Sequence, residues 1–515
     1  MGEPRADPGI ATPAEGEGNG KVPDSCPEWI VEIQMTLGCV NMNEVKTCSI
    51  CRVSEKIREA EAKAKDKGSY NYRPKCVAIG PIHRGTRSDL QIMEETKWRY
   101  MDKLLSRPTE QEQTETVKIC SEKIRKMESI IRASYTEKIE MASEELTRNM
   151  LLDACFLLEL LIRLSENTKT DPSDLDHIIN DKKKMVRVLT DLTLLENQIP
   201  FHLLTVLTSK LLGDSKEQEL ATLLELSDKK RFSPQKLVKS LFDECDISGA
   251  GPDLSKGVYH FLHLIHLCYP DPYPQQHRHS KAPRQLLRCA RKLQAFGITI
   301  RASQTNHSRG NNKTGILAAA LTEFVDKFEF KIEFNETQRE LTIPTLHIKE
   351  ATEVKWRNLI AWEQLGLIGV GYKFSSYAYF FKSLVSSVHD IQLLKEKGVI
   401  RVEREEAKDE DLVIMFQSII SGEEQKDGRY REVCKGLNKA KVNGVVGSCV
   451  LIFRMVWHYL RKFLEWLHRG LISSLLSFVD TYLGTPWKFL GVVSGAALLA
   501  LGILQTVYAI RAAKK

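Results

Sequence analysis

Hydrophobic residues recur at intervals of three and four along most of this chain, the spacing that places side chains on one face of an α-helix. Residues 150–164 are intensely apolar, but Asp153, Glu159 and Arg163 interrupt them. We therefore expect a buried core helix that is too short to cross a membrane. The other helices that the pattern predicts are 54–67, 90–105, a long charged helix at 110–141, 174–189, 191–213 with Pro200 inside it, 216–226, 234–242, 258–267, 353–364 and 377–397.

Residues 328–348 follow the two-residue period of a strand instead. Phe328, Phe330 and Ile332 alternate with polar residues, and the alternation returns at Leu341 and Ile343 after the polar run 335–338. Two alternating runs joined by a short polar segment predict a β-hairpin within a helical protein.

The longest uncharged segment is residues 489–510, which is 22 residues long. A helix needs roughly 20 apolar residues to cross the hydrocarbon core of a bilayer. Trp487 and Lys488 precede the segment and Arg511 follows it, and such side chains favour the headgroup layer. The expected fold class is therefore mainly α with a small β-hairpin or sheet, as one large helical domain plus a single C-terminal transmembrane helix held in a lipid bilayer.

Composition divides the chain into five parts. Residues 1–21, rich in Gly, Pro, Ala and Glu, are predicted to be a disordered tail, and residues 22–446 the globular domain. Residues 447–485 mix Arg and Lys with Phe, Leu and Trp, which indicates an amphipathic helix that lies either on the membrane or on the core. Residues 486–511 are the predicted anchor, and residues 512–515 a short basic tail.

The cysteines and the N-terminus bear on the compartment. Twelve cysteines are scattered through the chain, and its start lacks the apolar core of a secretory signal. Both features favour reduced thiols and a globular domain in the cytosol. The glycosylation sequons at Asn306, Asn312 and Asn335 would be used only if the domain were lumenal. We predict a cytosolic domain, on a membrane that the sequence does not identify.

Positive charge is concentrated in residues 278–313, which contain nine Lys or Arg and no acidic residue. Such a stretch in a membrane-held domain can contact anionic lipid headgroups. A solvated loop is the simpler interpretation. Nucleic acid is not an expected partner, because few aromatic residues interleave with the cations.

His260, His263 and His266 follow one another at i, i+3 and i+6, so a helix would place their imidazoles on one side. Neutral imidazoles in that arrangement can bind zinc. The surrounding residues 261–267 are otherwise apolar, which favours hydrogen-bonded core histidines instead.

Cys48 and Cys51 have the CxxC spacing of zinc or redox sites, and Cys39 and Cys76 could complete four thiolates. No second CxxC pair follows and no βαβ pattern surrounds the first, so we expect a structural role.

Glu196, Asn197 and Gln198 form a polar cluster just before Pro200. Glu196 could be a catalytic carboxylate. Alternatively, the carboxylate and the two amides could satisfy peptide groups that the proline leaves exposed. Motifs of the usual hydrolases, nucleotide-binding proteins and metalloproteases are absent from the sequence. We therefore expect no enzyme activity, no catalytic or metal-binding residues and no cofactor.

Several short blocks then carry a family resemblance. They are ICRVSEKIR at 50–58, VAIGPIHRG at 77–85, MEETKWRY at 93–100, DLTLLENQIPF at 191–201, LTIPTLHI at 341–348, RNLIAWEQ at 357–364 and PWK at 486–488. These blocks resemble the plant-specific family known as domain of unknown function 247, or uncharacterised protein family 0481. The family-signature residues in the second, third and fourth blocks, for which we expect a structural role, are Gly80, Pro81, Trp98, Glu196, Asn197, Gln198 and Pro200.

The resemblance implies a plant membrane protein with a C-terminal anchor and no established enzymatic activity. Some family members are associated with self-incompatibility recognition in grasses, which implies a non-enzymatic component of protein interaction or signalling with an unknown protein partner. This chain departs from the family at Ile82 and Arg84, where an aromatic residue and a second histidine are common. The alternative interpretation is an enzyme or metal-binding protein with an unrecognised site.

Overall fold

A computed structural model describes the protein at residues 48–59, 71–106, 110–166, 176–211, 258–273, 285–303, 320–366, 370–404, 407–420, 427–440 and 494–506, apart from a few positions inside these ranges. Within these ranges the chain is mainly helical with two small sheets. This matches the expected fold class for the globular part. The expected elements at 216–226, 234–242 and 447–485 lie outside the described residues.

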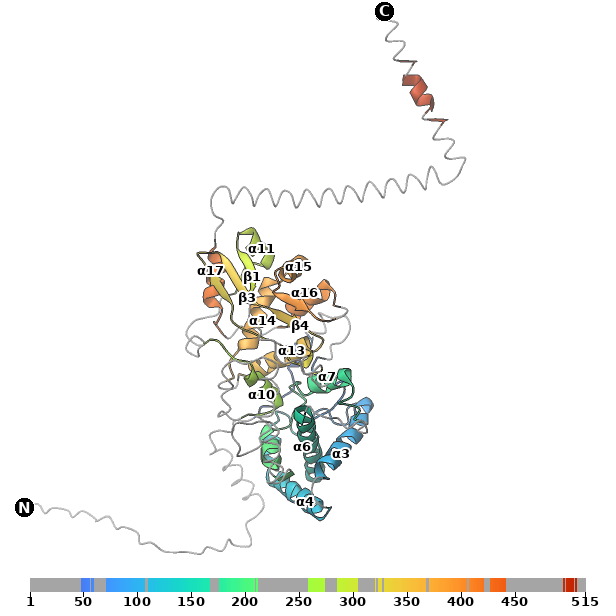
Figure 1. Ribbon diagram of the computed structural model, residues 1–515, viewed down its shortest axis with the longest axis vertical. Helices are drawn as coiled ribbons and strands as arrows, with labels where there is room; N and C mark the ends of the chain where they lie inside the picture. Colours follow the sequence, from blue (N-terminus) through green and yellow to red (C-terminus); the bar gives the residue numbers. More distant parts are fainter. Residues whose placement is uncertain are drawn as a thin grey trace, which may run out of the picture.

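The named elements in the first part of the described chain are all helices, and they occupy one end of the molecule (Figure 1). Its centre is α6, which packs against α3 and α4. The apolar residues of α6 are buried along almost its whole length, as expected of a core helix. The elements of this part are η1 (Ser88–Leu90), α3 (Gln91–Leu105), α4 (Glu110–Lys126), α5 (Glu128–Ala133), α6 (Ser143–Glu166) and α7 (Lys182–Asp191).

Two small sheets lie in the other end of the molecule, surrounded by the later helices (Figure 1). β3 (Glu340–Pro344) is central in the first sheet, parallel to β1 (Thr299–Ser303) and antiparallel to β2 (Glu333–Asn335). The β2–β3 pair is the predicted hairpin. The second sheet joins β4 (Leu346–Ile348) to β5 (Ile400–Val402) in parallel.

Further helices of the described residues surround these sheets or lie between the two ends (Figure 1). They are α10 (Phe261–Cys268), α11 (Ala290–Ala295), α13 (Thr352–Gln364), α14 (Lys373–Leu384), α15 (Val388–Glu396), α16 (Asp409–Ser418) and α17 (Arg431–Lys439). The apolar side chains of both ends join in one hydrophobic core. In it, Trp356 and Trp362 of α13 are completely buried.

The predicted helix 110–141 is wrong beyond residue 133. The segment instead forms two helices, α4 and α5, which are separated by a break at Met127. After α5 the backbone turns to pair with Ile50, whose amide donates to Ser134 O at 3.0 Å and whose carbonyl accepts from Thr136 N at 3.0 Å. Pairing with a distant segment replaces the last predicted helical turns.

The predicted helix 191–213 is also wrong in its first half, since residues 192–200 are not helical and a helix begins only at Phe201. Pro200 has no amide proton to continue a helix. Side-chain amides take the place of the missing backbone donors, because Gln198 Nε2 donates to Leu192 O and Leu194 O, both at 2.7 Å. The single predicted helix 377–397 is likewise two helices, α14 and α15.

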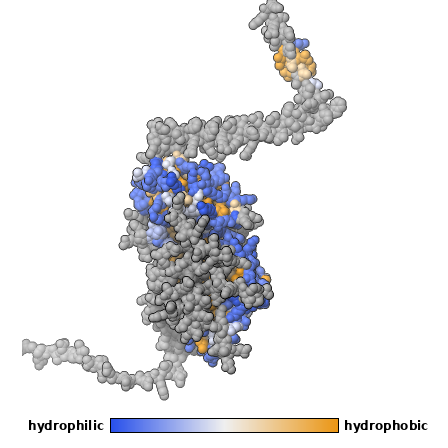
Figure 2. Space-filling view, viewed as in Figure 1, coloured by the Kyte–Doolittle hydropathy of each residue, from blue (hydrophilic) through white to orange (hydrophobic). Residues whose placement is uncertain are grey.

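The predicted anchor is described only in residues 494–506, where most positions are helical. Leu498, Leu499, Leu501 and Ile503 are 70%, 68%, 59% and 58% exposed there. Figure 2 shows this segment as an apolar surface, whereas the visible described surface of the domain is mostly hydrophilic. Within the described ranges, no helix combines the length and the apolar character needed to cross a membrane.

Candidate functional site

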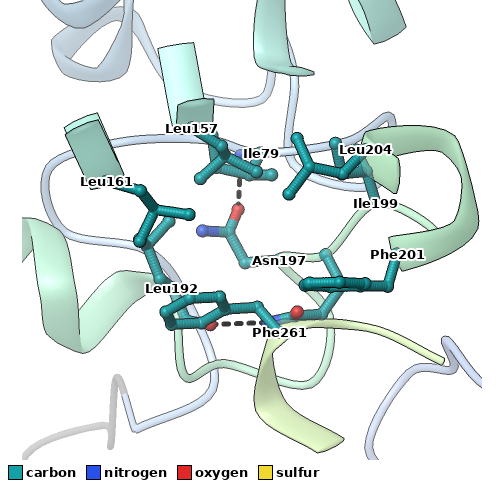
Figure 3. Close-up of a pocket in the computed structure, with 10 residues that line it drawn as sticks. Ile79, Leu157, Leu161, Leu192, Asn197, Ile199, Phe201, Leu204 and Phe261 are labelled. Atoms are coloured by element: carbon teal, nitrogen blue, oxygen red, sulfur yellow. Dashed lines mark hydrogen bonds between the residues drawn. The ribbon is translucent and has the colours of Figure 1, made fainter. Parts of the chain in front are cut away.

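The signature segment 192–200 lies in the interior of the molecule, between α6, the 77–80 segment and α10 (Figure 3). Glu196, Asn197 and Gln198 are all at most 2% exposed. Buried polar groups are costly unless they are hydrogen-bonded, so their partners define what this segment does.

Asn197 holds the 77–79 segment in place. Its Oδ1 accepts from Ile79 N at 2.7 Å, and its Nδ2 donates to Val77 O at 3.0 Å and to Asp191 O at 2.9 Å. One side chain thus satisfies peptide groups on two stretches of backbone that are more than a hundred residues apart in sequence.

Asp191 extends the same contact. Its carboxylate accepts from three successive amides, at 3.0 Å from Lys75 N, 2.6 Å from Cys76 N and 2.9 Å from Val77 N. Burial raises the pKa of the Asp191 carboxyl to about 6, although the three amides act in the opposite direction. The chain's own carboxylate therefore fills an amide cradle that could otherwise bind an anion.

The backbone of Gln198 packs directly against Gly80. The φ of +74° at Gly80 is a conformation that side chains with a Cβ rarely adopt, and a Cβ placed there would lie 2.3 Å from Gln198 O. Gln198 O also accepts from the Tyr135 hydroxyl at 3.0 Å. A glycine is thus needed at this position for conformation and for space. The next residue, Pro81, is partly buried.

Glu196 is buried, and both of its carboxylate oxygens lie close to neighbouring polar groups. Its Oε1 accepts from Val53 N at 2.7 Å and from the Arg58 guanidinium, and its Oε2 lies 3.1 Å from His83 Nε2. Burial would raise the pKa of this carboxyl, but His83 and Arg58 outweigh it and lower the pKa. A carboxylate with a lowered pKa is a weak general base, so the geometry favours a structural ion pair over catalysis.

A second buried ion cluster centres on Asp153 of α6. Asp153 Oδ1 accepts from Lys97 Nζ at 2.7 Å and from Arg84 Nη2 at 2.6 Å, and Oδ2 accepts from Gly80 N at 2.8 Å. Lys97 also pairs with Glu94 at 2.7 Å. Asp153 therefore ties α6 to the same glycine that contacts the signature segment, and Arg84 pairs with its carboxylate.

Sequence reasoning did not select Asp153 or Lys97 as site residues. The available signal was a carboxylate in the middle of an intensely apolar helix, which requires a buried cation as partner. Trp98, by contrast, does not take part in this network. It lies on α3 and is 48% exposed, so it is a surface residue, unlike the buried Glu196, Asn197 and Gln198.

The space beside the signature segment is very small. A cavity of about 10 Å³ is lined by Leu157 and Leu161 of α6, by Asn197, and by Phe201 and Phe261 among others (Figure 3). This volume accommodates roughly one water molecule. It does not accommodate a metabolite or a cofactor.

The three histidines of the predicted row lie at α10, where each has a different role. His260 is the N-cap, and its Nδ1 accepts from His263 N at 3.2 Å, while His263 Nδ1 accepts from Tyr259 N at 3.2 Å. His266 Nε2 lies 2.9 Å from Glu363 Oε1. Burial lowers the pKa of His263 to about 3 and that of His260 well below its ordinary value. The imidazoles of His260 and His263 are therefore neutral. The three rings contact different groups, and they form no shared metal-binding group among the described residues.

Glu363, which sequence reasoning missed, joins α10, α13 and α14. Its carboxylate accepts from Phe374 N at 3.0 Å and from Ser375 N at 2.7 Å, the free amides at the start of α14. Lys373 Nζ donates to His266 O at 2.6 Å. Burial raises the pKa of Glu363 and lowers that of Lys373. This cluster connects helices and opens to no described cavity.

Among the residues that the structure describes, no three His, Cys, Asp or Glu side chains are grouped so that they could hold a metal ion. Cys48 is exposed and Cys51 is buried, and neither forms a disulfide. Burial raises the pKa of Cys51 to about 12 and that of Cys76 to about 11, which disfavours the thiolates that metals bind. Cys39 lies outside the described residues.

The residues predicted at the membrane interface, Trp487, Lys488 and Arg511, also lie outside the described residues. The same holds for the sequons at Asn306 and Asn312. Asn335 is exposed at the end of β2, where its Oδ1 accepts from Gln338 N at 3.0 Å in the hairpin turn.

Comparison with known proteins agrees with the resemblance in the signature blocks. A curated relative, UPF0481 protein At3g47200 of Arabidopsis thaliana, is 24% identical over 476 residues, which cover 90% of this chain and 87% of that protein. No solved structure matches the chain. The model of the family DUF247, described as "Plant protein of unknown function", matches residues 50–501, and the chain therefore belongs to this plant family.

Proposed function

We propose that this protein is a non-enzymatic interaction or signalling component that a C-terminal helix tethers to a membrane, with its globular domain in the cytosol. The observation that carries the tether is the exposed apolar surface of the C-terminal segment. Leu498 and Leu499 are 70% and 68% exposed, within 22 uncharged residues. Soluble proteins rarely expose such a surface unless a membrane or a partner covers it.

The chemistry of the signature segment supports a non-catalytic role. Each polar side chain of the Glu196–Gln198 cluster contacts backbone groups or a partly buried cation, and the adjoining cavity of about 10 Å³ holds no substrate-sized ligand. Such a network stabilises the folded structure of the domain. A domain held rigidly at a membrane suits the presentation of a surface to another protein.

Membrane fractionation of plant cells tests the tether. The full chain should remain in the membrane pellet after carbonate extraction, whereas a chain that ends at residue 485 should move to the soluble fraction. A truncated chain that stays in the carbonate-resistant pellet would contradict the proposal. A thermal melt of the truncated chain that matches the full chain would show that the domain itself is intact.

A further inference from the structure

We infer that one face of the domain binds an anionic phospholipid surface. We call it the exit face and define it as Leu287, Arg291, Lys292 and Lys439. This inference rests on the proposed membrane tether and adds to it a contact between the folded domain and the lipid headgroups. The two can fail separately in the experiment below.

The exit face is built where the described domain ends. Leu287 N donates to Asn438 Oδ1 at 2.9 Å, and Asn438 Nδ2 donates to Gln285 O at 2.9 Å. The Arg288 guanidinium donates to Leu437 O at 2.8 Å and to Ala440 O at 2.7 Å. Residues 285–288 are thus fastened to the last turn of α17, after which the chain continues toward the predicted anchor.

The position of the exit face in the molecule is consistent with a contact between this face and the membrane. α11 and α17 lie at the same end of the domain, opposite α3 and α4 (Figure 1). Residues 441–488 join this end to the apolar segment. Because the two contacts belong to one chain, making one raises the local concentration of the other, so a weak lipid contact suffices for a tethered domain.

The exit face carries three exposed cations. Arg291, Lys292 and Lys439 are exposed, and none forms an ion pair with a carboxylate in the described part of the chain. Glu336 and Glu432 line a cavity together with Lys439 without forming an ion pair with it, and the buried carboxylate of Asp390 accepts from the backbone amide of Arg291 at 2.9 Å. Arg301 is not counted, because it lies 3.3 Å from Glu340.

An apolar side chain lies within this basic surface. Leu287 is 75% exposed, the largest exposed fraction of any described large hydrophobic residue. A leucine among cations is the combination that enters the boundary between headgroups and acyl chains. The surrounding sequence 278–313, with nine cations and no acidic residue, extends the same charge, and this favours an anionic bilayer over a neutral one.

The test uses the full chain reconstituted in vesicles that contain either photoactivatable phosphatidylserine or photoactivatable phosphatidylcholine, with crosslinks mapped by mass spectrometry. We expect phosphatidylserine to crosslink preferentially within residues 285–292 and 437–440, and added salt to weaken this preference. Because each cation near an anionic surface shifts the contact about fivefold, the triple variant R291E/K292E/K439E should lower the preference at least about tenfold.

The control reverses the same number of exposed charges on α7, at Lys182, Lys183 and Arg187, of which Lys182 lies 3.6 Å from Glu323. This variant should keep the preference. Equal crosslinking by the two lipids in a chain that floats with the vesicles would overturn the exit face and leave the tether standing. A chain that does not float with vesicles would overturn the tether and the exit face together.

Discussion

The contact between Gly80 and the signature segment gives the sharpest prediction about the fold. Gly80→Ala adds a Cβ that would lie 2.3 Å from Gln198 O and 3.2 Å from the Tyr135 hydroxyl, at a φ of +74°. The backbone atom of Gln198 cannot move aside alone, because its residue is held by two side-chain hydrogen bonds and by Tyr135. The substitution must therefore displace the segment or the 77–80 backbone.

Three contributions make up the expected loss in the free energy of unfolding. The left-handed conformation costs an alanine about 1 kcal/mol, and forcing an extra carbon into a packed interior costs about 1–3 kcal/mol. Weakening the 2.8 Å hydrogen bond from Gly80 N to the Asp153 carboxylate adds about 1 kcal/mol or more. We expect Gly80→Ala to lower the free energy of unfolding by about 3–5 kcal/mol.

Gly85→Ala is the matched control. Gly85 has a φ of +70°, but a Cβ there would meet nothing within 4 Å. It should cost only the conformational part, about 1 kcal/mol. The assay is urea unfolding of the detergent-solubilised full chain, followed by the fluorescence of buried Trp356 and Trp362. Equal losses in the two variants would refute the reasoning, since the steric contribution and the weakened hydrogen bond to Asp153 apply only to Gly80→Ala.

Three other predictions follow from the buried network. Asn197→Asp keeps an acceptor for Ile79 N but removes both donated hydrogen bonds, so urea unfolding should show a loss of about 2–4 kcal/mol; an unchanged midpoint would contradict the network. His263 has a folded pKa near 3, below its ordinary value, so it supports stability above pH 6.5 that is lost as the pH falls toward 3. Thermal melts of His263→Gln should therefore be less sensitive to pH over this window than those of the natural chain, and identical profiles would count against a buried neutral imidazole. Glu196 has a lowered pKa, so its contribution is present above pH 4.5 and is lost below it; Glu196→Gln should flatten the acid limb of the stability profile, and an unchanged limb would mean that the Arg58 pair contributes nothing.

The periodicity of apolar residues predicted the elements whose pattern lies within their own consecutive residues. Helices α3, α6, α10 and α13 begin and end close to their expected bounds, apart from an extra N-terminal stretch of α6, and the β2–β3 hairpin follows the expected alternation. These elements carry their own signal, since apolar residues recur along each of them at helical or strand spacing. Strands β1 and β5 were not predicted, because they are short and pair with partners far away in sequence.

The signature segment shows where periodicity fails. Residues 192–200 have a helical apolar pattern, but the Asn197 and Gln198 amides bond to backbone carbonyls and leave the segment irregular. A pattern of apolar positions contains no information about which peptide groups a side chain will satisfy. The polar cluster itself was visible in the sequence, whereas its partners on the 75–80 segment are known only from the fold.

The compartment of the domain is the central point of the proposed function, and Asn335 allows a direct test. This sequon is exposed in the hairpin turn, so an oligosaccharyltransferase in the lumen would reach it. The measurement is protease protection of intact plant membranes, with glycosidase treatment of the full chain and of Asn335→Gln. We predict a domain that is digested and a mobility that glycosidase does not change. A protected domain whose mobility shifts on glycosidase treatment, with the shift reduced in Asn335→Gln, would contradict the cytosolic placement.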